Sequence, residues 1–446
     1  MKPRKFKESE SGANLFFQSF DEQLNHNHPL FILANKVNWT RFDNKFGALY
    51  SSNGRPGIPT RIMVALSYLK YTYGLSDDEV VGQFCENVYF QYFCGFNFIQ
   101  HKSPCDSTSL VKWRNRVRDN GLEELLSETL AVALDMDILK IKDLNDVNLD
   151  TTVQPKNIGH PTDASLLHKA REHLVKQCEK EHIPLKRNFK RVGKFFLIRT
   201  KRYIHAKQFK RANKTQKKLK LFLKKVINEA RSSSHLKSEK LNDLIKKSEK
   251  VLNQNKKDKN KIYSIHEPNV ECIAKGKSHK PYEFGCKTSI LTTNRSSWVL
   301  GVQALHGLPY DGHTVNDALE QMKRICGKYP NNVYADKGYR GAQINCPEVK
   351  IHISGTKRGK SDSILKKLKR RSAVEPVIGH MKFKHRLDRN FLKGVLGDRI
   401  NSILSGCGKN LRKLIQQIGF LFFVFWVVIL EKIFPKKCSI KNLLPA

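Results

Sequence analysis

Between Lys186 and Lys225 the chain carries 17 lysine and arginine residues and no acidic residue. Apolar residues continue through this run, in FFLIRTKRYIHAKQF and LKLFLKKVI, which predicts helical packing rather than disorder. A charge run is usually a solvated face, but so many charges of one sign repel one another strongly in isolation. The run therefore favours a polyanionic partner such as a nucleic-acid backbone.

The excess of positive charge extends beyond this run. The 446 residues include 81 lysines and arginines against 41 aspartates and glutamates, a formal net charge of +40. Residues 161–260 hold 30 basic and 9 acidic residues, so about half of the net charge lies there. A surface this basic repels itself unless a polyanion is near, and nucleic acid is the commonest one. A merely basic soluble protein and an anionic membrane partner remain alternatives.

Signals for secretion or membrane insertion are weak. The amino-terminal MKPRKFKESESG has no apolar segment, so we expect no signal peptide. The apolar run Ile418–Leu430 has 13 residues, fewer than the roughly 20 that a membrane-spanning helix needs. We expect it to be a buried or partner-facing C-terminal element rather than a membrane anchor. The ten cysteines include no Cys-x-x-Cys pair, which fits reduced thiols in a cytosolic protein.

The first 140 residues have helical patterns. The segment GLSDDEVVGQFCEN contains a capping box, Ser76 with Glu79, which predicts a helix start. The segment CDSTSLVKWRNRVRDNG predicts a short helix that ends near Gly121. We expect Trp113 in this helix to anchor the core, whereas its basic residues either form a solvated face or approach DNA.

After the basic segment the pattern changes from helix to strand. The segment KTSILTTNRSSWVLGVQAL predicts two strands, at about 287–293 and 297–305, joined by a turn at NRS. A helix with apolar residues from Val315 to Ile325 follows, with Thr314 as its cap. The segments NNVYAD and EVKIHIS predict two more strands, and DVNLDTTV, which precedes the basic segment, predicts another. We therefore expect an α/β fold, a mixed sheet flanked by helices and interrupted by a basic helical insertion.

This order divides the chain into four parts. We expect a helical N-terminal domain that binds DNA at residues 1–140, and a sheet domain built from residues 141–160 and 263–400. Residues 161–262 form the basic helical insertion, and residues 401–446 form a C-terminal helical tail.

Two aspartates stand near the ends of predicted strands, Asp150 in NLDTTVQ and Asp336 in VYADKGYRG. A single aspartate at a strand end is most often a turn former. Carboxylates at adjacent strand ends can also gather divalent ions, because Mg²⁺ prefers hard oxygen ligands. Two-metal phosphoryl transfer uses such groups to hold ions about 3.5–4 Å apart. The basic neighbours Lys337 and Arg340 and the glycines at 338 and 341 favour this second interpretation of Asp336.

Glu375, in RRSAVEPVIGHMK, has two interpretations that the local pattern leaves equal. Ser372 precedes it by three residues, the spacing of a capping box, and Pro376 is tolerated only near a helix start. A helix that begins near Ser372 would explain the glutamate without any further role. However, Arg371 precedes this start and Lys382 lies seven residues after Glu375, about 20° from it around the helix. Basic groups beside a carboxylate would hold a phosphate next to a metal ion.

Four motifs resemble those of a known family. The strings DTTVQPKNIGHPTDASL, YDGHTV, VYADKGYRG and RRSAVEPVIGHMK are similar to motifs of bacterial insertion-sequence transposases of the Asp-Asp-Glu class, in particular the insertion sequence five family. The resemblance runs through about residues 55–135 and 145–430. It implies a ribonuclease-H-like catalytic domain that binds two Mg²⁺ or Mn²⁺ ions and cuts and joins DNA at the terminal inverted repeats of an element.

The resemblance also implies roles for single residues. Asp150, Asp336 and Glu375 match the catalytic, metal-binding carboxylates, and Arg371 and Lys382 match residues that position DNA phosphates. The family signature has a tyrosine where this chain has Leu368, so no tyrosine contact is expected at that position.

These matches lead to a functional hypothesis. We expect a cytoplasmic, nucleoid-associated transposase that binds the terminal inverted repeats and target DNA. It would act as a homodimer or higher assembly on double-stranded DNA, with no membrane partner, and Lys337 and Arg340 would add to its DNA contacts. The alternative is a catalytically inactive DNA-binding remnant that keeps the fold and the charge.

Overall fold

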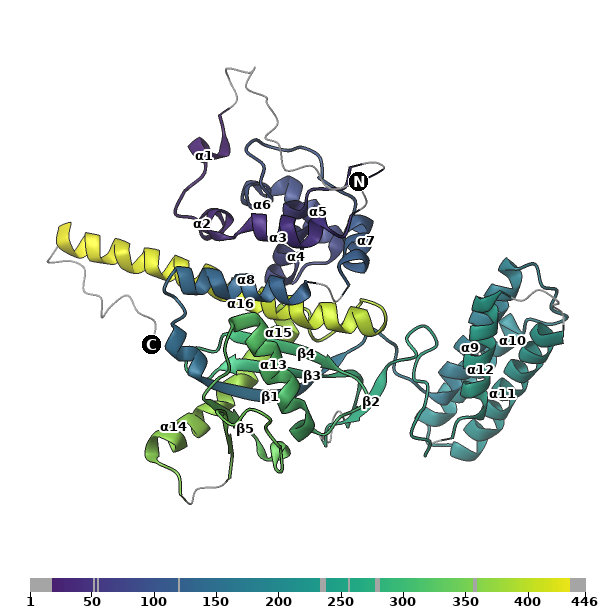
Figure 1. Cartoon of the computed structure of the whole chain (residues 1–446). Coiled ribbons are helices and arrows are strands. Elements are labelled where there is room, and N and C mark those ends of the chain that lie inside the picture. Colours follow the sequence, from purple (N-terminus) through teal and green to yellow (C-terminus); the bar gives the residue numbers. More distant parts are fainter. Residues whose placement is uncertain are drawn as a thin grey trace. The chain divides into compact units, whose positions relative to one another are not determined.

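The computed structural model describes residues 18–433, apart from residues 51, 52, 54, 55, 119, 120, 233–237, 256, 277–280 and 356–358, and it describes side chains as far as residue 422. The chain forms two compact units (Figure 1). Unit 1 joins the residues up to Pro155 to those from Cys286 onward, and unit 2 comprises Lys156–Gly285.

The N-terminal part of unit 1 is a set of helices around an apolar core. They are α1 (Phe20–Gln23), α2 (Pro29–Lys36), α3 (Trp39–Gly47), α4 (Thr60–Tyr73), α5 (Asp77–Glu86), α6 (Val88–Phe93), α7 (Ser107–Val117) and α8 (Leu122–Asp135). The predicted capping box is confirmed, because Ser76 Oγ accepts from the Glu79 amide and the Glu79 carboxylate accepts from the Ser76 amide. Trp113 is buried in the core, as predicted.

A mixed β-sheet forms the centre of unit 1. After the short 3₁₀ turn η1 (Ile141–Asn145), its strands are β1 (Asp146–Pro155), β3 (Tyr282–Thr293), β4 (Val299–Leu305), β5 (Asn332–Ala335) and β6 (Lys350–Ile353). The order across the sheet is β4-β3-β1-β5-β6. Strands β3 and β4 are antiparallel, whereas β1 and β5 are parallel, as are β5 and β6. Strands β1 and β3 run in opposite directions, because Asn294 N donates to Asp146 O at one end and Lys156 N donates to Phe284 O at the other.

Both faces of the sheet are covered, because adjacent residues of a strand point to opposite faces. Leu291 joins the large core of unit 1, which also contains residues of α13 (Val315–Cys326). Ile290, next to it in β3, packs instead with Val377 and Met381 of α15 (Val374–Lys384). Helix α15 follows α14 (Asp362–Arg370) and the short 3₁₀ turn η4 (Arg371–Ala373). These helices bring the last motif of the sequence against the sheet (Figure 1).

The long C-terminal helix α16 (Gly394–Ile433) packs against α4, α8 and β4, so the N-terminal helices and the sheet share one unit. The approach of α16 to α4 needs a glycine: a Cβ on Gly408 would lie 2.5 Å from the Tyr71 carbonyl oxygen. Tyr71 Oη also donates to Asn401 Oδ1 at 2.8 Å, which fixes the two helices by a buried polar contact.

The predicted apolar C-terminal element lies only partly within the described side chains. Ile418 is buried, whereas Phe420 and Leu421 are about half exposed. The side chains from residue 423 to Leu430 lie outside the described part. Across the described residues, every helix is too short or too polar to cross a bilayer.

Unit 2 contains the predicted basic helices. They are α9 (Asp163–Lys180), α10 (Lys190–His205), α11 (Phe209–Ser232) and α12 (Glu239–Asn253), which share their own apolar core. The short strand β2 (Glu271–Ala274) pairs antiparallel with the first residues of β3. Apolar residues at helical spacing thus fold the basic segment despite its charge.

The predicted α/β class is confirmed, and the predicted strands and helices from β1 to α15 occur in the predicted order. Strand β2 and helix α14 were not predicted, and two further details differ. Strand β1 continues beyond Asp150 to Pro155, because β3 pairs alongside it on the far side of the sheet. The predicted side-chain cap at Thr314 is wrong. The turn η2 (Asp311–Thr314) precedes α13, and Thr314 Oγ1 donates back to the Asp311 carbonyl instead of accepting from the helix.

Candidate active site

Asp150 and Asp336 lie on neighbouring parallel strands at the same level. Asn148 of β1 pairs with Tyr334 of β5, and each aspartate stands two residues beyond its member of this pair. Because side chains two residues apart point to the same face of a strand, both carboxylates leave the sheet on one side. Strand β5 ends at Ala335, and Asp336 begins the 3₁₀ turn η3 (Lys337–Tyr339), where Asp336 Oδ1 accepts from Gly338 N at 2.9 Å.

Asp150 is more buried than Glu375, with 17% of its side chain exposed against 68%. Its Oδ1 accepts from the Thr151 amide at 2.8 Å, and Arg371 Nη1 lies 3.5 Å from its Oδ2. Burial raises the pKa of Asp150 to about 6, and the negative charges of Asp336 and Glu375 add to the rise. The Thr151 amide and Arg371 oppose it. The structure therefore places Asp150 within the electrostatic reach of both other acids of the predicted triad.

A fourth carboxylate, that of Asp311, lies beside Thr151 and Gly338. It was not predicted as a site residue. Thr151 Oγ1 donates to Asp311 Oδ1 at 2.9 Å, and Lys287 Nζ lies 2.6 Å from the same oxygen. A Cβ on Gly338 would lie 3.0 Å from Asp336 Oδ1 and 3.1 Å from Asp311 Oδ2, so the two carboxylates flank this glycine. The motif YDGHTV contains Asp311, but nothing in its local pattern distinguishes it from a turn residue.

Tyr339 lies beside these acids. Its side chain is fully buried, and burial together with the charges of Asp311, Asp150 and Asp336 raises its pKa. The phenol therefore stays protonated and uncharged beside the carboxylates.

Arg371 links Asp150 to Glu375. Its Nη2 lies 4.0 Å from Glu375 Oε1 and its side chain is 16% exposed, whereas the Glu375 side chain is 68% exposed. Glu375 thus stands at the rim of the site, in the first turn of α15.

The predicted capping box at Ser372 and Glu375 is wrong. The backbone turns continuously from α14 through η4 into α15, so no open helix start exists at Ser372. The Ser372 hydroxyl donates back to the Lys369 carbonyl at 3.0 Å, as expected for a serine within helical backbone. Glu375 is therefore placed by the junction of two helices and not by a cap.

The other residues predicted to contact DNA are close in sequence to Asp336 or Glu375. Lys337 is the first residue of η3, Arg340 directly follows this turn, and both side chains are exposed. The Arg340 carbonyl accepts from Tyr310 Oη at 2.7 Å, which ties this turn to the segment that carries Asp311. Lys382 lies two turns beyond Glu375 in α15 and is partly buried.

The donor set fits a hard divalent cation such as Mg²⁺ or Mn²⁺. Its ligand atoms are carboxylate oxygens, and a cation would offset both the burial and the neighbouring negative charges that raise the pKa of Asp150. In the described residues, however, Asp150, Asp336 and Glu375 are not among the groups whose ligand atoms all lie within 4.8 Å of one another. The two aspartates therefore form the inner part of the site, and Glu375 would close it from the rim.

Unit 2 presents a strongly basic surface. Of the 17 basic residues between Lys186 and Lys225, all except Lys220 are exposed. Aromatic side chains stand among them, since the Arg199 guanidinium lies 5.7 Å from the Phe195 ring and 5.6 Å from the Tyr203 ring. An exposed basic surface with aromatic residues is typical of proteins that bind nucleic acid.

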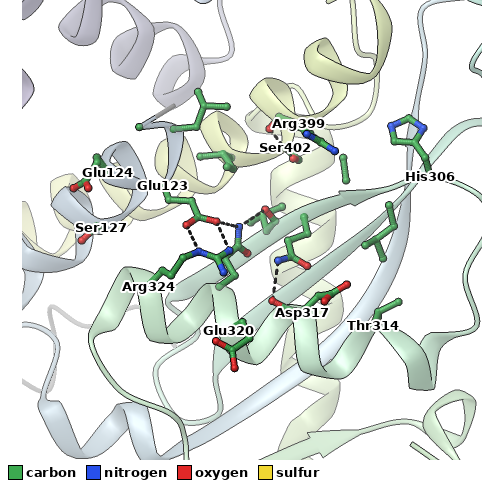
Figure 2. Close-up of a pocket in the computed structure, with 18 of the residues that line it drawn as sticks. Glu123, Glu124, Ser127, His306, Thr314, Asp317, Glu320, Arg324, Arg399 and Ser402 are labelled. Atoms are coloured by element: carbon green, nitrogen blue, oxygen red, sulfur yellow. Dashed lines mark hydrogen bonds and ion pairs between the residues drawn. The ribbon is translucent and has the colours of Figure 1, made fainter. Parts of the chain in front are cut away.

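A cavity of about 1010 Å³ in unit 1 lies apart from these acids (Figure 2). Its wall includes residues of α8, α13 and α16, and Arg324 and Glu123 form a two-point ion pair there, as the dashed lines show. None of the predicted site residues lines it. The predicted catalytic acids Asp150, Asp336 and Glu375 thus lie outside this cavity.

Two comparisons place the chain among known proteins. Residues 18–116, which cover α1 to nearly the end of α7, match the model of the transposase domain DUF772. The chain is also 45% identical, over 200 residues, to the uncharacterized protein ORF8 in the nfe locus of Rhizobium meliloti. That alignment spans 45% of this chain and 97% of the rhizobial protein. The chain belongs to a transposase-like family. No solved structure matches this transposase-like protein significantly.

Proposed function

We propose that this transposase-like protein is a DNA transposase of the Asp-Asp-Glu class, with Asp150, Asp336 and Glu375 as its catalytic carboxylates. The observation that carries the proposal is the position of Asp150 and Asp336, each two residues beyond a member of the Asn148–Tyr334 pair of parallel strands, with Arg371 lying between Asp150 and Glu375. This arrangement brings acids from β1, from the end of β5 and from α15 to the same side of the sheet.

The sheet supports a ribonuclease-H-like catalytic domain. Three antiparallel strands, β1, β3 and β4, are extended by the parallel strands β5 and β6, and β1 lies in the middle. With Asp150 on the central strand β1 and Asp336 directly after the neighbouring parallel strand β5, this arrangement supports the fold that the sequence resemblance implies. The large insertion then separates the first strand from the second.

The chemistry follows from the residues present. Two Mg²⁺ or Mn²⁺ ions held by the three acids would activate the attacking oxygen and stabilise the leaving oxygen in DNA cleavage and strand transfer. Asp311 would orient Thr151 and Lys287 beside the inner aspartates.

Four basic residues near the acids would hold DNA phosphates, because their positive charge and N–H donors suit phosphate oxygens. They are Arg371, Lys337, Arg340 and Lys382.

We further propose that the basic surface of unit 2 and the N-terminal helices bind DNA at the terminal inverted repeats. The exposed cations of α10 and α11 support this, since their contacts to phosphates would release counterions. Joining two element ends to a target requires at least two copies of the protein, so the active form would be a dimer or larger.

The test uses DNA that flanks the gene, placed on a supercoiled plasmid with Mg²⁺. We expect the protein to nick the element ends and to join them to target DNA. Asp150→Asn, Asp336→Asn and Glu375→Gln should each lower cleavage about 100-fold or more, because metal ligation supplies several kcal/mol to the transition state. Binding of the same DNA should change little. Asp317→Asn, an exposed acid of the same unit, serves as the control.

Two results would contradict the proposal. Normal Mg²⁺-dependent cleavage by Glu375→Gln would remove Glu375 from the catalytic set. DNA binding without cleavage by the unmodified chain would instead support the inactive remnant.

A further inference from the structure

Three side chains in unit 1 converge outside the acidic site. Cys286 lies in β3, His306 directly follows β4, and Asp398 lies near the start of α16. Their ligand atoms all lie within 4.8 Å of one another. Cys286 and Asp398 are buried, and 22% of the His306 side chain is exposed.

The geometry of this Cys-His-Asp cluster suits a metal better than a hydrogen-bonded pair. His306 Nε2 is buried and, within the described residues, has no hydrogen-bond partner. It lies 3.6 Å from Asp398 Oδ2, too far for a hydrogen bond. Two ligands of one tetrahedral Zn²⁺ are separated by roughly 3.4–3.6 Å, given zinc bonds of about 2.0–2.3 Å.

Neighbouring amides hold the ligands in place. Asn390 Nδ2 donates to Asp398 Oδ1 at 2.6 Å, which leaves Oδ2 directed at His306. Gln154 Nε2 lies 3.5 Å from Cys286 Sγ and 3.4 Å from Asp398 Oδ1. Asn401 Nδ2 donates to Gln154 Oε1 at 3.0 Å and so fixes this amide. Such outer contacts orient metal ligands and stabilise their ionised forms.

We propose that Cys286, His306 and Asp398 bind one Zn²⁺ ion that ties β3, β4 and α16 together. A thiolate and an imidazole select zinc over Mg²⁺, so this site is distinct from the acidic one in chemistry as well as in residues. His306 lines the cavity of Figure 2, whereas Cys286 and Asp398 do not. The fourth ligand, a water, and the path of entry lie on that side.

The experiment is a metal titration of the full-length protein, stripped with a chelator and kept in excess Mg²⁺. Co²⁺ serves as the probe, because its tetrahedral complexes are coloured and a thiolate ligand adds a charge-transfer band in the near ultraviolet. We expect one Co²⁺ per chain with that band, its displacement by one Zn²⁺, and a higher melting temperature with Zn²⁺.

Single-residue variants test which side chains bind the metal. Cys286→Ser should abolish the thiolate band and weaken Zn²⁺ binding at least about 100-fold, and Asn390→Ala should weaken it on the order of 10–100-fold. His306→Ala, at a partly exposed position, should lose the tetrahedral spectrum even if Cys286→Ser folds poorly. Cys407→Ser, another buried cysteine, and Asp336→Asn should keep the full signal. A wild-type protein without the thiolate band, or an unchanged band in Cys286→Ser, would overturn the proposal.

Discussion

When no metal is bound, the ionised carboxylate of Asp150 lowers the stability of the folded chain. Burial and the neighbouring acids raise its pKa from 3.8 to about 6 in the folded chain. The folded state therefore binds the proton more tightly than the unfolded state, so the contribution of Asp150 to stability is fully present below pH 4 and is lost as the pH rises through 6. A pKa difference of about 2 between the two states corresponds to roughly 3 kcal/mol of folding free energy.

We expect metal-free Asp150→Asn to be more stable than the wild type by about 1–3 kcal/mol at pH 7.5, because the amide removes this charge. The gain should shrink towards zero at pH 4, where the wild-type carboxyl is protonated. Urea unfolding at the two pH values measures it. Equal effects at both pH values would show that Asp150 is not strained by its charge.

Asp311 gives a second prediction at this scale. Because it holds Thr151 and Lys287 beside the inner aspartates, Asp311→Asn should lower strand cleavage by on the order of 10–100-fold while DNA affinity stays constant. Single-turnover cleavage at saturating protein measures the chemical step. A loss of DNA affinity with unchanged cleavage would assign Asp311 to binding instead.

Single residues also show how far the sequence alone reaches. Asp150 and Asp336 could be identified because each follows an alternating apolar run and has a matching motif. Asp311 could not, because its link to Thr151 spans 160 residues and depends on the sheet register. The Cys-His-Asp cluster was missed for the same reason, since its members lie on three separate elements without metal-ligand spacing.

At the scale of elements, two serines with the same sequence spacing differ in structure. Ser76 precedes an open helix start and caps it, whereas Ser372 lies inside continuous helical backbone. We expect Ser76→Ala to cost about 1 kcal/mol of stability and Ser372→Ala to cost less than about 0.5 kcal/mol. Chemical denaturation of the two variants tests this, and equal losses would contradict the assignment.

The contrast has a physical origin. A capping-box pattern reports a local preference, and it is realised only where the preceding backbone is extended. At Ser76 the backbone is extended, with φ −76° and ψ 174°. At Ser372 the preceding helix α14 continues into the turn, which the four-residue pattern cannot reveal. Strand alternation was more informative, because the runs of apolar residues that predicted β1, β5 and β6 do form strands of the sheet.

For the whole molecule, charge should govern DNA binding. Replacing the exposed Lys214, Lys217, Lys218 and Lys224 of α11 by glutamine should weaken binding and lower the slope of log affinity against log salt by about 0.9 for each phosphate that these lysines neutralise. Lys247→Gln is the matched control, since its Nζ pairs with Asp243 at 2.5 Å. Fluorescence anisotropy across a salt series measures both values. An unchanged slope in the fourfold variant would exclude α11 from the DNA interface.

The most direct measurement replaces Mg²⁺ by Fe²⁺ and maps hydroxyl-radical cleavage of the protein backbone itself. Radicals cut only near the bound metal, so they report which segments meet at the site. With hydrogen peroxide and ascorbate added, we expect cuts near Asp150, Asp336 and Glu375 together, all absent in Asp150→Asn. One equivalent of Zn²⁺ per chain occupies the Cys-His-Asp cluster beforehand. Cuts confined to other segments, or cuts that persist in Asp150→Asn, would contradict a single metal site built from β1, β5 and α15.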